Sequence, residues 1–238
     1  MAKLIAVYGS PGSGKTTTSL KLAMSAYIQT KDESVVFLSS DLTAPSMALL
    51  FPNYHPDEIC SLSTVLDNTE ISSENILKNA VTVKTMKNFC CLGFKAGENK
   101  YSFPVPTAEK INTLFDVLGD SFDYVFADCS GDEISKKALI KANKVIRVVS
   151  PDLKGMTWYS SNKHTDRTEN EDLFNVVNIT EKELFLPTEE VCTKLHSVTA
   201  VLPYSRAVRQ QMLDGRMYER LNDKKYNKKM QSIVNKIL

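Results

Sequence analysis

The chain contains 238 residues, of which 42% are apolar and 24% are charged, and its formal net charge at pH 7 is +1. This is the composition of an ordinary globular protein. The charge gives no indication of a dedicated nucleic-acid binder, although a local basic patch remains an alternative. No apolar run approaches the ~20 residues that span a bilayer, and the first residues do not form a secretory signal. We therefore expect a cytoplasmic protein.

Apolar stretches of strand length alternate with stretches of helical periodicity, which is typical of a parallel sheet flanked by helices. Strands are predicted at 3–8, 34–39, 124–128, 145–149, 174–178 and 197–202. Helices are predicted at 15–28, 107–118, 133–143 and 207–238, the last one broken near Gly215. Residues 42–101 carry a weaker pattern of short helical pieces and turns. We interpret that region as an elaboration of a single domain over 1–238 with a three-layer, doubly wound, mostly parallel α/β fold.

A glycine-rich segment separates the first predicted strand from the first helix. Its sequence, GSPGSGKT at 9–16, matches the P-loop pattern G-x-x-x-x-G-K-[ST] in the strand-then-helix context that the motif requires. Glycines let backbone N–H groups converge on phosphate oxygens, and the helix N-terminus adds its dipole. Lys15 would supply a cation to the β- and γ-phosphates, and Thr16 a hydroxyl to Mg²⁺. The predicted phosphate-binding residues are Gly9, Ser10, Pro11, Gly12, Ser13, Gly14, Lys15, Thr16 and Thr17.

Two aspartates follow apolar strands. Asp128 ends the predicted strand at 124–128, and Asp41 lies just beyond the strand at 34–39. Because α/β folds bind ligands at the carboxyl edge of the sheet, both aspartates should lie near the P-loop. We interpret Asp128 as a Walker-B carboxylate that reaches Mg²⁺ through water. Asp41 would position the attacking water or bind Mg²⁺ through a water. The alternative role of each is to cap the segment that follows it.

The order of these parts resembles the ParA/MinD branch (SIMIBI class) of P-loop ATPases. The likeness covers about 1–50 and 107–220, and it includes the later segments at 142–152, 176–178 and 201–205. The resemblance implies ATP or ADP with Mg²⁺ as the ligand, and a nucleotide-dependent homodimer. It also implies that Asn178 and Pro203 flank the adenine and that Asp41 is the hydrolytic switch residue.

Two positions depart from that family's pattern. Members that form ATP-sandwich dimers usually carry a second lysine one residue after the first P-loop glycine, and here that position is Ser10, followed by Pro11. A hydroxyl cannot supply the transition-state charge of a lysine, a kind of loss worth ~10²–10⁵ in rate. The acidic residue commonly found two positions before Asp41 is replaced by Ser39. The departures imply a protein that binds ATP but hydrolyses it slowly, or dimerises differently.

Degenerate relatives of this kind include pilus-localisation ATPases and ParA-like proteins of conjugative elements. We therefore expect a weak Mg²⁺-dependent ATPase that acts as a nucleotide-dependent switch, has a protein partner, and positions DNA or a secretion or conjugation apparatus. A small-molecule or nucleotide kinase and a pseudo-ATPase scaffold are the alternatives. A kinase usually carries an arginine-rich lid, whereas the arginines here have helical spacing. They are Arg206, Arg209, Arg216 and Arg220.

Two basic segments could contact partners. In the C-terminal segment 223–238, apolar residues recur at helical spacing and lysines occupy the opposite side. We favour a helix that packs on the domain over one that contacts DNA or an anionic membrane. The segment 154–167 carries Trp158 and Tyr159 between basic residues, and we favour an amphipathic helix over a partner surface. The apolar positions of the C-terminal face are Tyr226, Met230, Ile233, Val234 and Ile237.

The five cysteines are odd in number and lack the spacing of zinc ligands. The adjacent pair Cys90 and Cys91 could be read as a redox site. We favour buried thiols in a reducing cytosol. The other three are Cys60, Cys129 and Cys192.

Overall fold

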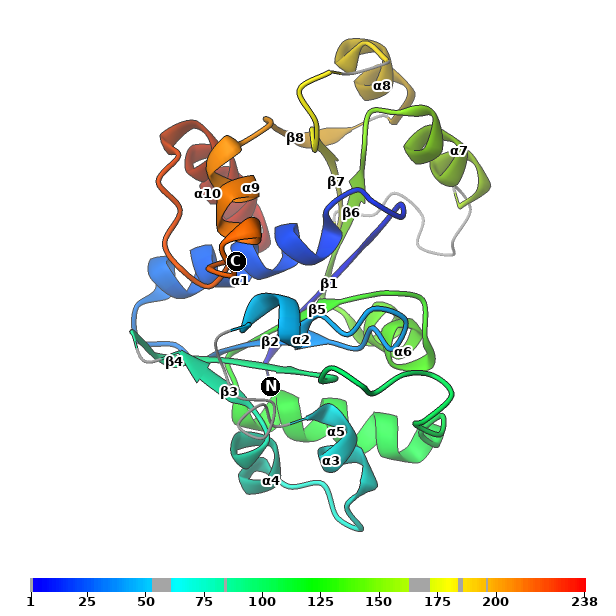
Figure 1. The fold of residues 1–238 in the computed structure, drawn as a ribbon, viewed down its shortest axis with the longest axis vertical. Helices are drawn as coiled ribbons and strands as arrows, with labels where there is room; N and C mark the ends of the chain where they lie inside the picture. Colours follow the sequence, from blue (N-terminus) through cyan, green and yellow to red (C-terminus); the bar gives the residue numbers. More distant parts are fainter. Residues whose placement is uncertain (1, 53–60, 84, 163–171, 184–185, 196) are drawn as a thin grey trace.

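The computed structural model describes residues 2–52, 61–83, 85–162, 172–183, 186–195 and 197–238. Its strands are β1 (Lys3–Gly9), β2 (Val35–Ser39), β3 (Val81–Val83), β4 (Met86–Gly93), β5 (Tyr124–Asp128), β6 (Lys144–Val149), β7 (Leu173–Asn178) and β8 (Val198–Leu202). Within the described ranges these eight strands form one sheet in the order β3-β4-β2-β5-β1-β6-β7-β8 (Figure 1). Neighbouring strands are parallel except β3 and β4. The predicted mostly parallel α/β fold is confirmed.

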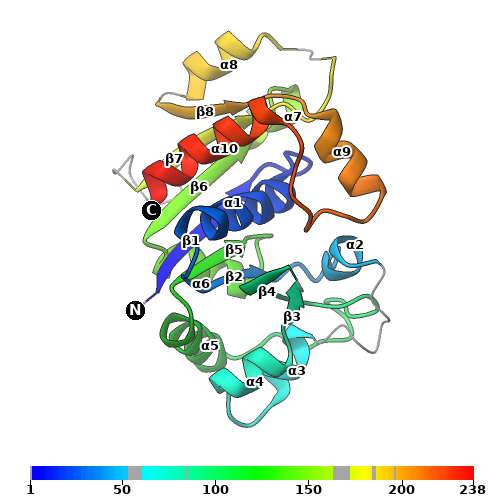
Figure 2. The ribbon, with the colours of Figure 1, turned by 90° about the vertical axis from the view of Figure 1, so that its left-hand side faces the viewer.

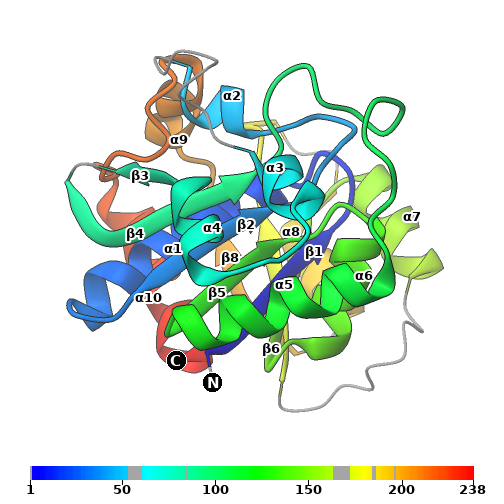
Figure 3. The ribbon, with the colours of Figure 1, turned by 90° about the horizontal axis from the view of Figure 1, so that it is seen from below.

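Helices cover both faces of the sheet. On one face, α1 (Lys15–Thr30) and α10 (Lys224–Ile237) lie side by side (Figure 2). The opposite face is covered by α5 (Ala108–Ser121) and α6 (Glu133–Lys141), as Figure 3 shows, and by α3 (Leu62–Asp67) and α4 (Ser73–Lys78). Next to them, α7 (Leu153–Ser161) and α8 (Thr188–Leu195) pack on β6 and β7. The short α2 (Met47–Leu50) and α9 (Arg206–Leu213) both border the cavity described below.

The central strand β1 places the P-loop in the middle of the carboxyl edge. It lies between β5 and β6, and its buried side chains alternate between the two layers. Ile5 and Val7 pack in the layer of α1 and α10, whereas Leu4 and Ala6 pack in the layer of α5 and α6. A strand covered on both faces is almost wholly apolar, which is why it was recognisable in the sequence.

One expectation about secondary structure is wrong and another is confirmed. The region 42–101 contains β3 and β4 in addition to short helices, and β4 is a full member of the sheet that pairs in parallel with β2. Its first half exposes Lys87 and Asn88. These polar residues interrupt the apolar run by which a buried strand is recognised in a sequence. The predicted break of the C-terminal helical region near Gly215 is confirmed: the region forms two helices, α9 and α10, separated by the non-helical stretch 214–223. Gly215 has φ 65, and a Cβ there would lie 2.0 Å from Pro52 Cγ, so only glycine fits this turn.

The C-terminal helix α10 packs on the domain, as favoured from the sequence. Its apolar face lies against α1 and β8, and its lysines are exposed. In the described part of the chain, no helix combines the length and the apolar character needed to cross a membrane.

The amphipathic helix favoured for the start of segment 154–167 is present as α7. Tyr159 is buried in the core cluster and Trp158 packs against it, half-buried. Residues 163–167 of that segment lie outside the described residues.

Candidate functional site

The P-loop takes a backbone conformation that depends on glycine. Gly12 and Gly14 have φ of 81 and 74, in the left-handed region that favours glycine. Gly9 lies so close to β6 that a Cβ would come within 2.0 Å of the Val148 carbonyl oxygen. The N-cap position of α1 is Gly14, and no side chain caps the helix there. Uncapped N–H groups at a helix start bind anions, so the geometry of this turn fits an anionic ligand.

A cavity of about 620 Å³ opens at this helix start. One wall is the P-loop, and the others come from the ends of β2, β7 and β8 and from the helices α2, α9 and α10. Asp41, Asn178 and Pro203, all predicted as site residues, border it together. The P-loop residues in the wall are Gly12, Gly14, Lys15, Thr16 and Thr17.

The remaining predicted P-loop residues do not line the cavity. Ser10 and Ser13 are fully buried beneath the loop, where the Ser13 N–H donates to the Ser10 carbonyl oxygen (3.1 Å). The Ser10 N–H donates to the Val148 carbonyl oxygen of β6 (3.1 Å), which ties the loop to the sheet. Pro11 is exposed. The structure thus divides the motif into residues that face a ligand and residues that shape the loop.

Asp128 ends β5 as a buried carboxylate, with 2% of its surface exposed. Burial, and to a lesser extent the charge of Asp41, raises its pKa to about 6, although the Thr16 hydroxyl and the Lys15 ammonium lower it. Ser39 Oγ donates to Asp128 Oδ2 at 3.4 Å. Among the described residues, Oδ1 of Asp128 has no hydrogen-bond partner.

These groups fit a Mg²⁺–nucleotide complex. A buried carboxylate oxygen without a partner is costly unless a ligand satisfies it, and Mg²⁺ prefers oxygen ligands. In the described part of the chain, no cluster of three or more His, Cys, Asp or Glu side chains could hold a metal ion alone. Mg²⁺ here would therefore take phosphate oxygens together with Thr16 and Asp128, as P-loop proteins do.

Asp41 borders the cavity and also organises its own loop. Its Oδ1 accepts the N–H groups of Thr43 (2.8 Å) and Ala44 (3.0 Å), which forms an Asx-type turn. This turn caps the residues directly after Asp41, whereas the N-cap position of the following helix α2 is Ser46. The turn leaves Asp41 at the cavity wall, so both roles are compatible.

Asn178 makes a contact that the sequence did not reveal. Its Nδ2 donates to the Ser13 carbonyl oxygen at 2.7 Å, across 165 residues of chain, and the side chain is 6% exposed. A Cβ on Gly14 would lie 2.7 Å from the same Nδ2. Asn178 thus fixes the P-loop to the end of β7, and it lines the cavity beside Pro203.

Lys21 of α1 is a second buried residue near the site that the sequence analysis did not identify. It is 4% exposed, and its Nζ donates to Gln211 Oε1 (2.6 Å) and to the carbonyl oxygen of Met217 (2.6 Å). Burial lowers its pKa to about 7, against the opposing charge of Glu219. It joins the P-loop helix to the 214–223 stretch, whose Met217 lines the cavity. The only sequence signal was a lysine among the apolar residues of a buried helix.

The four cysteines in the described part of the chain are free thiols. Cys90, Cys91 and Cys129 are buried free thiols, and Cys192 is half-buried. Burial raises the pKa of Cys90 to about 12 and raises those of Cys91 and Cys129 well above 9, so the thiols stay neutral and unreactive. Cys60 lies outside the described residues.

No protein-family model matches the chain, and no curated protein matches it. Solved structures match over almost the whole chain. A ParA family ATPase from Chlorobium tepidum TLS is 14% identical, with a TM-score of 0.72 and coverage of 98% of each chain. A putative plasmid partition protein from Borrelia burgdorferi B31, bound to AMPPNP, is 17% identical, with a TM-score of 0.72 and coverage of 99% of this chain and 98% of that one.

The septum site-determining protein MinD from Pyrococcus horikoshii OT3, complexed with Mg-ADP, is 18% identical, with a TM-score of 0.71 and coverage of 100% of this chain and 96% of that one. At these identities the likeness is one of fold. The protein has the fold of ParA/MinD P-loop NTPases, as the resemblance of its motifs predicted.

Proposed function

We propose that this protein is a nucleotide-dependent switch of the ParA/MinD type that binds ATP or ADP with Mg²⁺ and hydrolyses ATP slowly in the cytoplasm. The observation that carries the proposal is that the buried carboxylate of Asp128 interacts with the P-loop residues Lys15 and Thr16, which line the cavity. A phosphate cradle alone would fit any anion. The unsatisfied carboxylate oxygen of Asp128 calls for a cation as well. A Mg²⁺–nucleotide supplies both the anionic phosphates and the cation.

In this proposal, the residues in and around the cavity have separate roles. Backbone N–H groups of the P-loop and the Lys15 ammonium would bind the phosphates, while Thr16 and Asp128 would hold Mg²⁺, which would supply positive charge to the phosphate oxygens. Asp41 follows β2 and Asn178 ends β7, on opposite sides of β1 in the sheet, and Asp41 would orient the attacking water. Asn178 and Pro203 border the part of the cavity assigned to adenine.

Slow hydrolysis is proposed because the P-loop has no second lysine. Ser10 is enclosed, with its Oγ buried, so this position offers no charge to a phosphate of its own or a neighbouring protomer. Among the described residues that line the cavity, the cations are Lys15 and Arg209. Arg209 belongs to α9, after the strand that leads to Pro203, and is exposed. A nucleotide-dependent homodimer would therefore not rest on the lysine contact typical of the family.

The cellular role proposed is the positioning of DNA or of a secretion or conjugation apparatus through a protein partner. Its support is the fold, which the chain shares with a plasmid partition protein and with a septum site-determining protein. Direct contact of α10 with DNA or membrane is not required, because the apolar face of that helix is already buried.

The test is nucleotide binding by the wild type, Lys15→Ala and the matched control Lys154→Ala, which removes an exposed lysine of α7. Calorimetry with ATP, ADP and AMPPNP, with and without Mg²⁺, should show Mg²⁺-dependent binding by the wild type and the control. Lys15→Ala should lose at least about tenfold in affinity, because a charged hydrogen bond is removed. Absence of binding by the wild type would overturn the proposal. Rapid phosphoryl transfer to a metabolite would replace it with a kinase.

Turnover is tested separately with Ser10→Lys and the control Ser10→Ala. If the missing lysine limits hydrolysis, the lysine variant should hydrolyse ATP faster than the wild type, whereas the alanine variant should not. Brisk hydrolysis by the wild type itself would contradict the slow-switch proposal.

A further inference from the structure

Two loops beside the cavity are joined by hydroxyl–carboxylate contacts that the proposed function does not yet use. They are the β2 loop (residues 40–46), which carries Asp41, and the β5 loop (residues 129–132), which follows Asp128. Ser40 Oγ in the first loop donates to Asp132 Oδ2 in the second at 2.9 Å. The same Oδ2 accepts the hydroxyls of Ser130 (2.6 Å) and Ser135 (2.7 Å).

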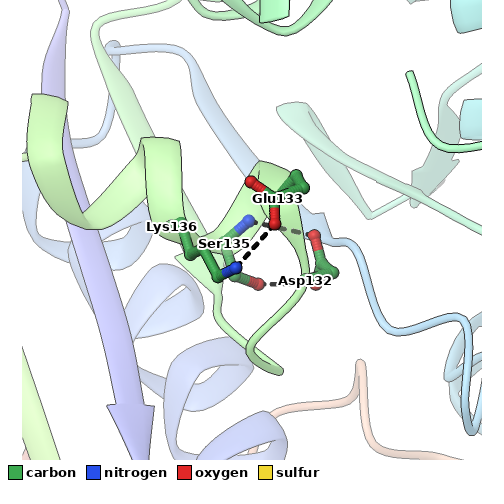
Figure 4. Close-up of polar contacts among 4 residues, drawn as sticks. All are labelled: Asp132, Glu133, Ser135 and Lys136. Atoms are coloured by element: carbon green, nitrogen blue, oxygen red, sulfur yellow. Dashed lines mark hydrogen bonds and ion pairs between the residues drawn. The ribbon is translucent and has the colours of Figure 1, made fainter. Parts of the chain in front are cut away.

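Capping of α6 explains only part of this arrangement. Asp132 is the N-cap residue, and its Oδ1 accepts the Ser135 N–H at 3.0 Å, which satisfies the helix start. Figure 4 shows Asp132 facing Ser135, next to the separate ion pair between Lys136 and Glu133 (2.6 Å). The cap leaves Oδ2 free for other donors, and that oxygen is the one that reaches across to the β2 loop.

The contact between the loops is partly buried: Ser40 is enclosed, and Asp132 is half-buried. Ser40 is 2% exposed and Ser135 is 1% exposed, and their Oγ atoms lie 3.0 Å apart. Water therefore cannot easily replace the Ser40 hydroxyl if it is removed, and a carboxylate makes stronger hydrogen bonds than a neutral acceptor. The Ser40–Asp132 bond is thus a specific connection rather than an exchangeable surface contact.

The connection leads directly to the proposed catalytic groups. Ser40 precedes Asp41, whose carboxylate fixes the rest of the β2 loop through the N–H groups of Thr43 and Ala44. On the other side of Ser40, Ser39 bonds to Asp128 at 3.4 Å and accepts the Ser46 hydroxyl at 2.8 Å. Neighbouring serines of one segment therefore contact Asp128, which ends β5, and Asp132, which caps α6.

We propose that Asp132 is a positioning residue for ATP hydrolysis: through Ser40 it holds the β2 loop so that Asp41 faces the phosphates. This inference rests on the proposed function, because it assigns a role in the hydrolysis of the bound nucleotide. The contacts that bind a diphosphate lie in the P-loop, whereas Ser40 and Asp132 are not among the residues that line the cavity. Loss of the connection should therefore reduce turnover and leave ADP affinity unchanged.

Ser40→Ala is the main test, because it breaks the connection and leaves the α6 cap intact. Its matched control is Ser130→Ala, which removes a hydroxyl bond to the same Oδ2 from within the β5 loop. A second pair is Asp132→Asn against Glu133→Gln, which remove adjacent charges, only one of them connected to the β2 loop. Steady-state ATP turnover, ADP affinity by calorimetry and the midpoint of urea unfolding are measured for each.

We expect Ser40→Ala and Asp132→Asn each to lower turnover by about ten- to a hundredfold, as misplacement of a catalytic group does. ADP affinity should stay within about twofold. The double variant should be little slower than either single one, because both break the same connection. Ser130→Ala and Glu133→Gln should turn over like the wild type.

The outcomes separate this inference from the proposed function. If the wild type binds no ATP, both are wrong. If it binds ATP but hydrolyses none, the binding function stands and the positioning role fails. Wild-type turnover in Ser40→Ala overturns the inference alone. So does a variant whose ADP affinity falls as much as its turnover, since that result indicates general damage to the site.

Discussion

Replacing Asp128 with asparagine should stabilise the ligand-free protein at neutral pH. Burial raises the pKa of this carboxyl group from 3.8 to about 6, despite the partial compensation by Thr16 and Lys15. The folded protein therefore holds the proton more tightly than the unfolded chain does, and its stability falls as the pH rises from about 4 to about 6. About two pKa units, at ~1.4 kcal/mol each, make ionised Asp128 unfavourable by about 3 kcal/mol at pH 7.

Urea unfolding of both proteins at pH 4, 5, 6 and 7, without nucleotide or Mg²⁺, measures this effect. Asp128→Asn should be more stable than the wild type by about 3 kcal/mol at pH 7, and the difference should shrink toward zero at pH 4. Mg-ADP should stabilise the wild type and have little effect on the variant. A variant less stable than the wild type at pH 7, or a difference that does not change with pH, would refute the reasoning.

Asp123→Asn is a control for which the expected change in stability at neutral pH is opposite to that of Asp128→Asn. This exposed carboxylate accepts the Ser34 N–H and hydroxyl, which lower its pKa. A carboxyl group whose pKa is lower in the folded protein stabilises the fold at pH values above its pKa in the unfolded chain. This stabilisation is lost as the pH falls through the pKa of the folded protein. Asp123→Asn should therefore be less stable than the wild type at neutral pH, and this deficit should disappear as the solution is acidified.

Three further substitutions test other parts of the structure. Asn178→Ala removes the amide that holds the P-loop carbonyl, and calorimetry should show about a tenfold loss of ADP affinity; an unchanged affinity would mean that the loop holds its shape unaided. Gly9→Ala places a Cβ 2.0 Å from a β6 carbonyl oxygen and should abolish ADP binding. In the control Gly119→Ala, the new Cβ on α5 meets open space, and the free energy of unfolding should rise by up to ~1 kcal/mol. Ile233→Ala in α10 should destabilise the fold strongly and Lys229→Ala hardly at all, as urea unfolding would measure.

The parts of the site that are local in sequence could be predicted. The P-loop motif carries its own backbone geometry, because left-handed glycines and a helix start are encoded within a few residues. Asp41 and Asp128 could be placed at the carboxyl edge because each follows an apolar strand, and parallel strands end on the same side. The fold class followed from the same alternation of strands and helices.

Contacts between distant segments could not be predicted. The bond from Asn178 to Ser13 depends on how β7 is placed relative to the P-loop, which no periodicity specifies. The bond from Ser40 to Asp132 joins two loops of common polar residues, neither of which has a motif. Strand β4 escaped detection because its exposed start interrupts the apolar run. In each case the missing information is register or loop geometry, which only the packed structure supplies.

The amphipathic C-terminal segment shows how packing decides between interpretations that share one sequence pattern. Helices that pack on a domain, lie on a membrane or contact DNA have the same apolar periodicity, so the sequence left three alternatives. In the structure the apolar side chains of α10 are buried against the domain. They are Tyr226, Met230, Ile233, Val234 and Ile237.

Burial of each such side chain stabilises the fold by ~1.5–3 kcal/mol, so the face as a whole contributes on the order of 10 kcal/mol, as much as the net stability of a typical domain. Release of α10 into water would cost about that amount. Ile233 is fully buried, and Ile233→Ala should therefore lower the free energy of unfolding by ~2–5 kcal/mol, against less than ~0.5 kcal/mol for the exposed Lys229→Ala. If α10 instead detached readily, Ile233→Ala would leave unfolding unchanged and weaken binding to anionic vesicles.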